Sequence, residues 1–94
     1  MFRSLNWRTD RVEHIAEHGV TPVEVEQAVF EDAERLLIKG SRSLRNPQRF
    51  IYYNLGRTAA GRYVTVVLLD EGSGQALPVS AGDMDAKERR RYRG

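Results

Sequence analysis

Cysteine is absent from the 94 residues of this chain. Its absence excludes a disulfide framework, a thiol nucleophile and a metal site built from thiolates. No apolar run approaches the length of a membrane-spanning helix, and the first seven residues hold no apolar stretch of signal-peptide length. We therefore expect a cytoplasmic protein that does not bind membranes. A chain of this length forms a single domain, residues 1–94.

Acidic residues are missing from one long internal stretch. Between Arg35 and Leu69 there is no aspartate or glutamate, whereas there are seven basic residues. The first 34 residues carry eight acids against three arginines, and the last 25 carry five of each sign. The acid-free stretch also holds four of the eight aromatic residues. A basic segment with tyrosines is typical of a surface that binds phosphates and unstacked bases.

Helix signals lie at the two ends of the chain. Residues 10–13 have the spacing of a capping box and predict a first helix that ends at Gly19. Residues 21–24 form a second box with proline at the first helical position, and predict a helix to about Glu31. A last helix is predicted to start at Asp83 or Asp85, and residues 85–88 again have the spacing of a capping box.

Strand signals fill the middle of the chain. Alternating or β-branched runs predict four strands over residues 35–39, 49–55, 62–69 and 75–80, and residues 5–7 resemble a short additional strand. The 62–69 run is apolar on both faces and should be central, while Pro78 indicates an edge or a bulge. The predicted fold class is α+β, with two N-terminal helices, a four-stranded mainly antiparallel sheet and a C-terminal helix.

The family resemblance described below implies metal-independent RNA cleavage, which needs groups that stabilise the charge of the phosphorane and move protons. Arg49 and Arg62 begin adjacent predicted strands, so we expect them to converge across the sheet. The candidate catalytic residues are Arg49, Arg62, Glu88 and Tyr92, and the candidate RNA-binding residues are Arg45, Tyr52, Arg57, Tyr63 and Arg89. Tyr53 is predicted to lie in the core, whereas Tyr52 and Tyr63 are predicted to lie on an exposed face.

Two of these candidates have a simpler alternative. Glu88 has the spacing to cap the last helix together with Asp85, and Tyr92 could anchor that helix by packing. His14 and His18 match the spacing H-x-x-E-H of some zinc peptidases, which leaves a zinc hydrolase as a further hypothesis. The predicted helix ends directly after His18, which argues against that hypothesis.

Several short motifs, in order and spacing, match a known family. They are Trp7, His18-Gly19-Val20, Glu24, Val29–Asp32, Gly56–Thr58, Gly61-Arg62, Val66-Val67, Val79–Ala81, Glu88-Arg89 and Tyr92. With them the chain resembles the BrnT toxins of bacterial type II toxin–antitoxin systems. The resemblance implies a RelE-like α+β fold and a ribonuclease that needs no cofactor and no metal. It also implies a cognate antitoxin, for which we expect an acidic or partly disordered contacting segment, and a homodimer or a heterotetramer with that antitoxin.

The chain departs from the family pattern at four positions. Phe50, Ile51, Leu77 and Gly82 stand where the family usually has charged residues. These departures motivate an alternative function, namely a catalytically inactive toxin homologue or a module that binds RNA without cutting it.

Overall fold

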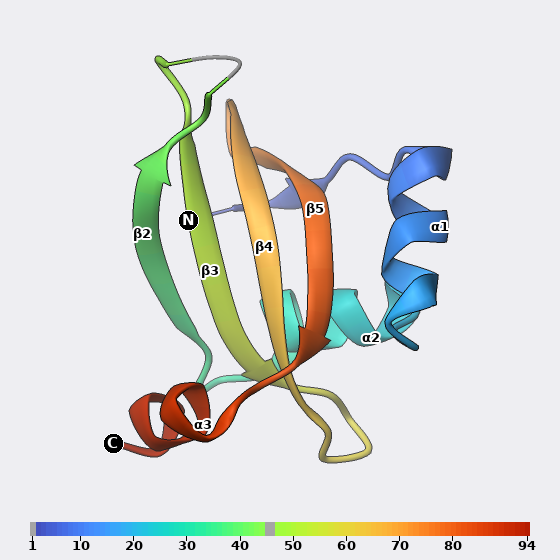
Figure 1. Ribbon diagram of the computed structural model, residues 1–94, viewed down its shortest axis with the longest axis vertical. Coiled ribbons are helices and arrows are strands. Elements are labelled where there is room, and N and C mark those ends of the chain that lie inside the picture. Colours follow the sequence, from blue (N-terminus) through green and yellow to red (C-terminus); the bar gives the residue numbers. More distant parts are fainter. Residues whose placement is uncertain (1, 45–46) are drawn as a thin grey trace.

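The computed structural model describes residues 2–44 and 47–94, which form a five-stranded sheet with helices on both sides (Figure 1). The strand order is β1-β5-β4-β3-β2. The strands are β1 (Ser4–Leu5), β2 (Leu36–Arg42), β3 (Phe50–Arg57), β4 (Tyr63–Gly72) and β5 (Gln75–Asp83). The helical segments are α1 (Thr9–Glu17), α2 (Pro22–Glu26), the π-helical η1 (Gln27–Glu31) and α3 (Ala86–Arg93).

The predicted α+β class is confirmed, but the predicted sheet is too small. β1 pairs with β5 in parallel, whereas the other neighbouring strands are antiparallel. The sheet is therefore mixed and has five strands. Only two residue pairs join β1 to β5, Ser4 with Gln75 and Leu5 with Ala76, and so short a pairing leaves little periodicity in the sequence.

Local capping decides where two of the helices begin. Thr21 and Glu24 form the predicted capping box before α2, and Asp85 and Glu88 form the one before α3. The box predicted at Asp10 is wrong: the N-cap is Arg8, two residues earlier, without a side-chain cap, and Asp10 instead forms ion pairs with Arg8 and Arg11. The second helix is also not one continuous α-helix, because it changes to π-helical pairing in η1.

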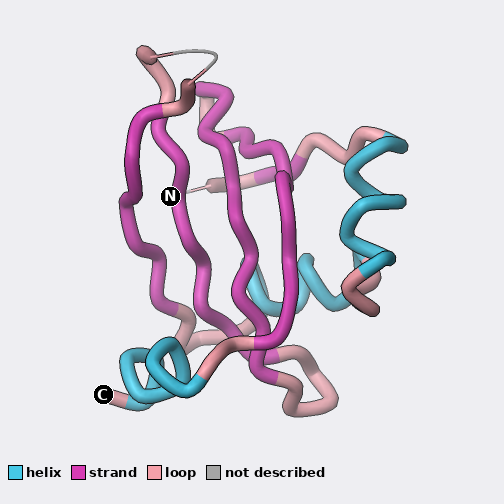
Figure 2. The backbone as a smooth tube through the Cα atoms, in the orientation of Figure 1, coloured by secondary structure: helices cyan, strands magenta, loops and turns pink. Residues whose placement is uncertain are grey.

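The hydrophobic core lies on one face of the sheet, here called the inner face. Val64, Val66 and Leu68 point to this face from β4 and are fully buried against residues such as Ile15 and Val25. Burial of each such aliphatic side chain contributes about 1.5–3 kcal/mol. α1 and α2 lie on the inner side, whereas α3 lies across one end of the opposite, outer face (Figure 2).

A close approach between η1 and β3 fixes the segment that follows η1. A Cβ atom at Gly56 would collide with the backbone carbonyl of Ala28, so only glycine allows this contact. The buried Asn54 donates a hydrogen bond of 3.0 Å to the same carbonyl oxygen. Because η1 is held against the end of β3, the residue after it, Asp32, reaches the backbone of Arg57.

Two further predictions about the sheet are confirmed. β4 is central, since it lies between β3 and β5. Pro78 lies at a bulge, where the register of β4 against β5 shifts beside its partner Leu68. In the described part of the chain, no helix combines the length and the apolar character required to cross a bilayer.

Candidate nucleic-acid interface

Three guanidinium groups surround the ring of Tyr63 at one end of the outer face. The Cζ atoms of Arg57 and Arg89 lie 5.0 Å and 4.4 Å from the ring centroid. The Cζ atom of Arg93 lies 5.8 Å from the same centroid. Tyr92 meets Tyr63 edge-to-face, with 5.8 Å between the two centroids. We call these five residues the Tyr63 cluster.

The register of the sheet and the cap of α3 bring the Tyr63 cluster together. Arg57, the last residue of β3, lies directly opposite Tyr63, the first residue of β4. The capping box at Asp85 fixes the start of α3. Arg89 and Arg93 are four residues apart on that helix, with Tyr92 between them, so all three side chains share one side. The register of β3 against β4 and the capping box of α3 thus bring together side chains that are far apart in the sequence.

The guanidinium groups of this cluster form no direct ion pair within the described residues, although the charge of Asp32 acts on Arg57. In residues 2–44 and 47–94, the arginines that form ion pairs are Arg8, Arg11 and Arg62. The guanidinium groups of the Tyr63 cluster belong to none of those pairs. Guanidinium groups that lack an ion-pair partner attract anions. Arginine is well suited to bind phosphate, because it can donate two parallel hydrogen bonds.

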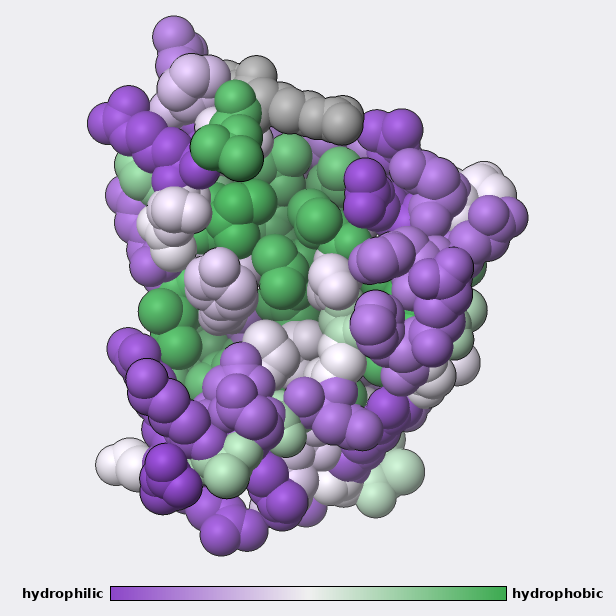
Figure 3. Space-filling model, in the orientation of Figure 1, coloured by the Kyte–Doolittle hydropathy of each residue, from purple (hydrophilic) through white to green (hydrophobic). Residues whose placement is uncertain are grey.

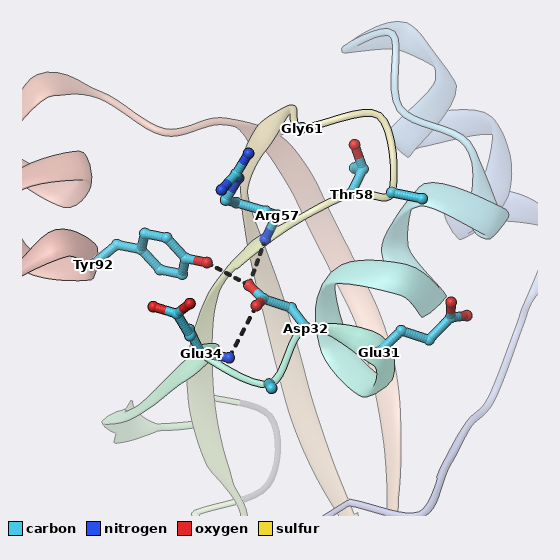
Figure 4. Close-up of a pocket in the computed structure, with 9 residues that line it drawn as sticks. Glu31, Asp32, Glu34, Arg57, Thr58, Gly61 and Tyr92 are labelled. Atoms are coloured by element: carbon cyan, nitrogen blue, oxygen red, sulfur yellow. Dashed lines mark hydrogen bonds between the residues drawn. The ribbon is translucent and has the colours of Figure 1, made fainter.

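Asp32 holds the neighbouring backbone and Tyr92 in place (Figure 4). Its carboxylate accepts hydrogen bonds from the Tyr92 hydroxyl at 2.6 Å, from the Arg57 amide at 2.8 Å and from the Glu34 amide at 2.9 Å. These groups line an open hollow of about 370 Å³, with Thr58 and Gly61 on its far wall. Asp32 therefore connects the end of η1, the end of β3 and the last turn of α3.

The electrostatics separate the two tyrosines of the cluster. A hydrogen bond from Arg93, the charge of Arg57 and a hydrogen bond from Arg89 lower the pKa of Tyr63. Burial, the hydrogen bond to Asp32 and the nearby negative charges raise the pKa of Tyr92 well above its ordinary value. Burial acts to raise the pKa of Asp32, but its hydrogen bonds and the charge of Arg57 outweigh burial and lower it. Tyr63 is thus the phenol that ionises more readily, and Tyr92 stays protonated.

The predicted convergence of Arg49 and Arg62 is wrong. Each precedes one of two antiparallel neighbours, so the two residues lie at opposite ends of the β3–β4 pair. Arg49 lies beside Gly72, at the end of the sheet away from the Tyr63 cluster. Lys39 and Arg42 lie over the ring of Phe50, at 3.9 Å and 5.4 Å from its centroid. The basic residues of the acid-free stretch are therefore divided between two ends.

Arg62 is occupied by internal partners. Its Nε atom donates to Asp83 at 2.7 Å, and its Nη1 atom donates to the Gly19 carbonyl at 2.7 Å and lies 3.4 Å from Glu24. The hydrogen bond to Asp83 and the charges of both acids raise the pKa of Arg62 despite its partial burial, and Arg62 in turn lowers the pKa of Asp83. Arg62 therefore links α2, the start of β4 and β5. Its guanidinium group is bound by internal partners, whereas that of Arg57 forms no ion pair in the described residues.

The remaining predicted candidates lie apart from the cluster. Tyr52 was expected on an exposed face but is only 7% exposed and packs edge-to-face on Phe2, while Tyr53, expected in the core, is 38% exposed. The sequence separates the two faces of β3 but does not tell which face the helices cover. Glu88 forms the cap with Asp85, as its simpler alternative predicted. Arg45 lies outside the described residues.

Four of the predicted residues, Arg57, Tyr63, Arg89 and Tyr92, come together, and two participants were missed. Arg93 could have been found from its spacing of four residues after Arg89 on an expected helix. Asp32 belongs to a motif that supports the family resemblance, but no local pattern indicates that it reaches Tyr92. Its partners lie 25 and 60 residues further along the chain.

The two histidines of the H-x-x-E-H motif lie against each other. Their ring centroids are 5.4 Å apart, and Nδ1 of His14 lies 3.9 Å from a carboxylate oxygen of Glu17. Over residues 2–44 and 47–94, no group of three or more histidine, aspartate or glutamate side chains has an arrangement that could hold a metal ion. The zinc hypothesis therefore gains no support from the geometry.

Comparisons with known proteins were negative: no family model matches the sequence, and no curated protein matches it either. The geometry of the Tyr63 cluster is thus the main basis for assigning a function. Chemically, the cluster offers donors for a phosphate and a phenol with a lowered pKa. The adjoining hollow is lined by Glu31, Asp32 and Glu34 as well as Arg57, so a phosphate is favoured at the guanidinium groups and not inside the hollow.

Proposed function

We propose that this protein is a BrnT-like toxin with a RelE-like fold, which cleaves RNA without a metal ion and is neutralised by a cognate antitoxin. The observation that supports the proposal is the set of three guanidinium groups around Tyr63, none of which forms an ion pair within the described part of the chain. Because none of the three is held in a direct ion pair, these groups retain their attraction for a polyanion, and the nearest carboxylate, Asp32, only partly offsets the charge of Arg57.

In the proposed reaction, a scissile phosphate binds among Arg57, Arg89 and Arg93. Tyr63, as the phenolate, takes the proton of the ribose 2′-hydroxyl, and the 2′-oxygen attacks the phosphorus atom. The guanidinium groups stabilise the negative charge that develops on the phosphorane oxygens. The bond to the 5′-oxygen breaks, and that oxygen takes a proton from a water molecule, while the resulting hydroxide takes the proton from Tyr63 and restores the phenolate. The products are a 2′,3′-cyclic phosphate and a 5′-hydroxyl end.

Tyr63 is the residue of the cluster that best fits the general base. A base works best when its pKa lies near the working pH, and the pKa of Tyr63 is shifted in that direction. The pKa of Asp32 is shifted away from neutrality, so its carboxylate is a weaker base than usual. The roles of Asp32 and Tyr92 are to hold Arg57 and α3 in position.

The second candidate is RNA binding without cleavage. It is favoured by the apolar or small residues at Phe50, Ile51, Leu77 and Gly82, and by the separation of Arg49 from the cluster. A site with phosphate donors but few proton-transfer groups binds RNA well and catalyses slowly.

The test of the proposed function is RNA cleavage by the purified protein in EDTA. We expect cyclic-phosphate products from the wild type and no products from Tyr63→Phe, which removes only the titrating hydroxyl. Single-stranded RNA binding by Tyr63→Phe should stay within roughly twofold of the wild type, because the ring and the guanidinium groups remain. RNA that binds but is never cut by excess wild-type protein would favour the second candidate.

A double variant tests the guanidinium groups. Arg57→Ala with Arg89→Ala should abolish both cleavage and growth inhibition in cells. Arg91→Ala is the matched control, because Arg91 lies on the same helix but lines a groove on its other side. Loss of activity in the control as large as in the double variant would contradict a specific role for the Tyr63 cluster.

A further inference from the structure

The outer face of the sheet carries apolar side chains that no part of the described chain covers. Alternation along the strands places Ile38, Ile51, Tyr53, Val67 and Leu69 on this face, where the register sets them beside one another. Four of the five are partly exposed, and Tyr53 is 38% exposed. None of them belongs to the core cluster of the inner face or packs against it. Apolar side chains gather over the strands on the face turned toward the viewer in Figure 3.

The helices leave this surface open because they are distributed unequally. α1, α2 and η1 cover the inner face, whereas α3 crosses only the end of the outer face that holds the Tyr63 cluster (Figure 1). A sheet face with a contiguous apolar surface is usually covered by a helical layer or by a partner. The surface over β2, β3 and β4, beside α3, is where a covering helix would pack.

A groove continues the apolar face up to α3. It has a volume of about 380 Å³, and its walls include Ile38, Tyr53 and Leu55 from the strands and Lys87 and Arg91 from α3. Asp85 and Glu88 also line it, but both carboxylates accept hydrogen bonds from backbone amides of the α3 cap. The strands that form the floor contain no acidic residue between positions 35 and 69. The hydrogen bonds of the cap leave both carboxylates charged, but with Lys39 the groove is lined by three basic side chains against two acidic ones, so its net charge is positive.

We propose that the outer face binds an amphipathic helix of a protein partner, with an apolar stripe against Val67 and Tyr53 and acidic residues toward Lys87 and Arg91. The charges on the rim favour this occupant over a second copy of the chain. In a two-fold dimer whose axis passes beside the groove, each basic rim would meet its own copy, and like charges across an interface are unfavourable. The inference rests on the proposed function for the existence of a partner, and adds where and by which chemistry it binds.

A pair of designed peptides tests the proposal. Both have about 18 residues, roughly five helical turns, with the same leucine stripe. One carries glutamates beside the stripe and the other carries lysines at the same positions. By fluorescence anisotropy, we expect the acidic peptide to bind the wild-type protein at least about tenfold more tightly than the basic one, with the difference reduced in high salt.

Two matched variants locate the binding surface. Val67→Asp should abolish binding of the acidic peptide. Val23→Asp makes the same change at an exposed valine of α2, 64% exposed, and should leave binding unchanged. If Val67→Asp does not fold, judged by circular dichroism, the exposed double variant Lys87→Glu and Arg91→Glu replaces it. That variant should lose the preference for the acidic peptide and gain one for the basic peptide.

Three outcomes would overturn the proposal. They are equal binding of the two peptides, an equal effect of the two aspartate variants, and a wild-type dimer in sedimentation that Val67→Asp dissociates, which would assign the face to a second copy. RNA binding of Val67→Asp is measured in parallel and should be unchanged, because Val67 lies outside the Tyr63 cluster. A failure of the docking proposal is thereby distinguished from a failure of the proposed function, which would show only in the RNA measurements.

Discussion

Arg57 and Arg62 stand on either side of the same turn between β3 and β4, yet their environments are opposite. Arg62 lies between Glu24 and Asp83, and its hydrogen bonds join three elements. The guanidinium of Arg57 lies over the ring of Tyr63 without an ion-pair partner in the described residues. The sequence presents them as equivalent basic residues, but the fold uses one for structure and leaves the other free for a ligand.

The largest expected effect is on the stability of the fold. Arg62→Ala should lower the free energy of unfolding by about 1–2 kcal/mol, because it removes charge-assisted hydrogen bonds, of which solvent screens the one to the exposed Asp83. Arg57→Ala should change it by about 0.5 kcal/mol or less, as is usual for an exposed side chain. Urea denaturation monitored through Trp7 fluorescence measures both. Equal losses would show that the two arginines do not differ in their structural role.

The second effect is on RNA affinity and runs in the reverse order. Arg57→Ala should weaken single-stranded RNA binding about tenfold and reduce the slope of log affinity against log salt by about 0.7, as expected for one lost phosphate contact. Arg62→Ala, at a temperature where it is folded, should bind within roughly twofold of the wild type. Filter binding at several salt concentrations gives both numbers. A larger loss for Arg62 would place the RNA on the other side of the turn.

The third effect is the loss of folding stability at low pH. Asp83 and Asp32 both have lowered pKa values in the folded protein. Each therefore contributes stability that is complete above the ordinary aspartate pKa of about 3.9 and is lost as the pH falls through the folded value. Solvent screening keeps the contribution of the exposed Asp83 small. Between neutral pH and pH 3, Asp83→Asn and Asp32→Asn should each lose less stability than the wild type, as measured by the midpoints of urea denaturation. If both variants lose as much stability as the wild type, the two ionised carboxylates do not stabilise the fold.

The smallest effect is spectroscopic and compares the two rings of the cluster. The pKa of Tyr63 is lowered and that of Tyr92 is raised. In an ultraviolet titration of the phenols, Tyr63→Phe should remove a tyrosine with a lowered pKa, and Tyr92→Phe one with a raised pKa. The Tyr92 hydrogen bond stabilises the fold below the ordinary tyrosine pKa of about 10, and this contribution is lost as the pH rises through the folded value. Two variants with identical titration curves would contradict the difference between the rings.

Much of the local structure follows from short-range patterns. Thr21 and Asp85 cap their helices as predicted, because a capping box is complete within four residues. The apolar residues on both faces of the 62–69 run correctly predict a central strand, and Pro78, which indicated an edge or a bulge, lies at a bulge. The failure at Asp10 is also local, since two adjacent arginines compete for its carboxylate.

The composition of the candidate site could be predicted only in part. A tyrosine beside arginines in an acid-free stretch predicts Arg57 and Tyr63, and a basic terminal helix predicts Arg89 and Tyr92. Arg49 and Arg62 were wrongly paired because strand starts converge in parallel sheets, whereas neighbours in an antiparallel sheet begin at opposite ends. The predicted exposures of Tyr52 and Tyr53 were reversed, because alternation defines two faces of a strand without telling which face the helices cover.

The sequence by itself determined the elements, their caps and the excess of positive charge in the middle of the chain, since each depends on residues within a few positions of one another. Only the tertiary structure decided which arginine is paired and which is free. That outcome depends on whether a carboxylate from a distant element, such as Glu24 of α2 or Asp83 of β5, arrives within a few ångströms. Coulomb attraction and hydrogen bonding act over such short distances in space, irrespective of separation along the chain.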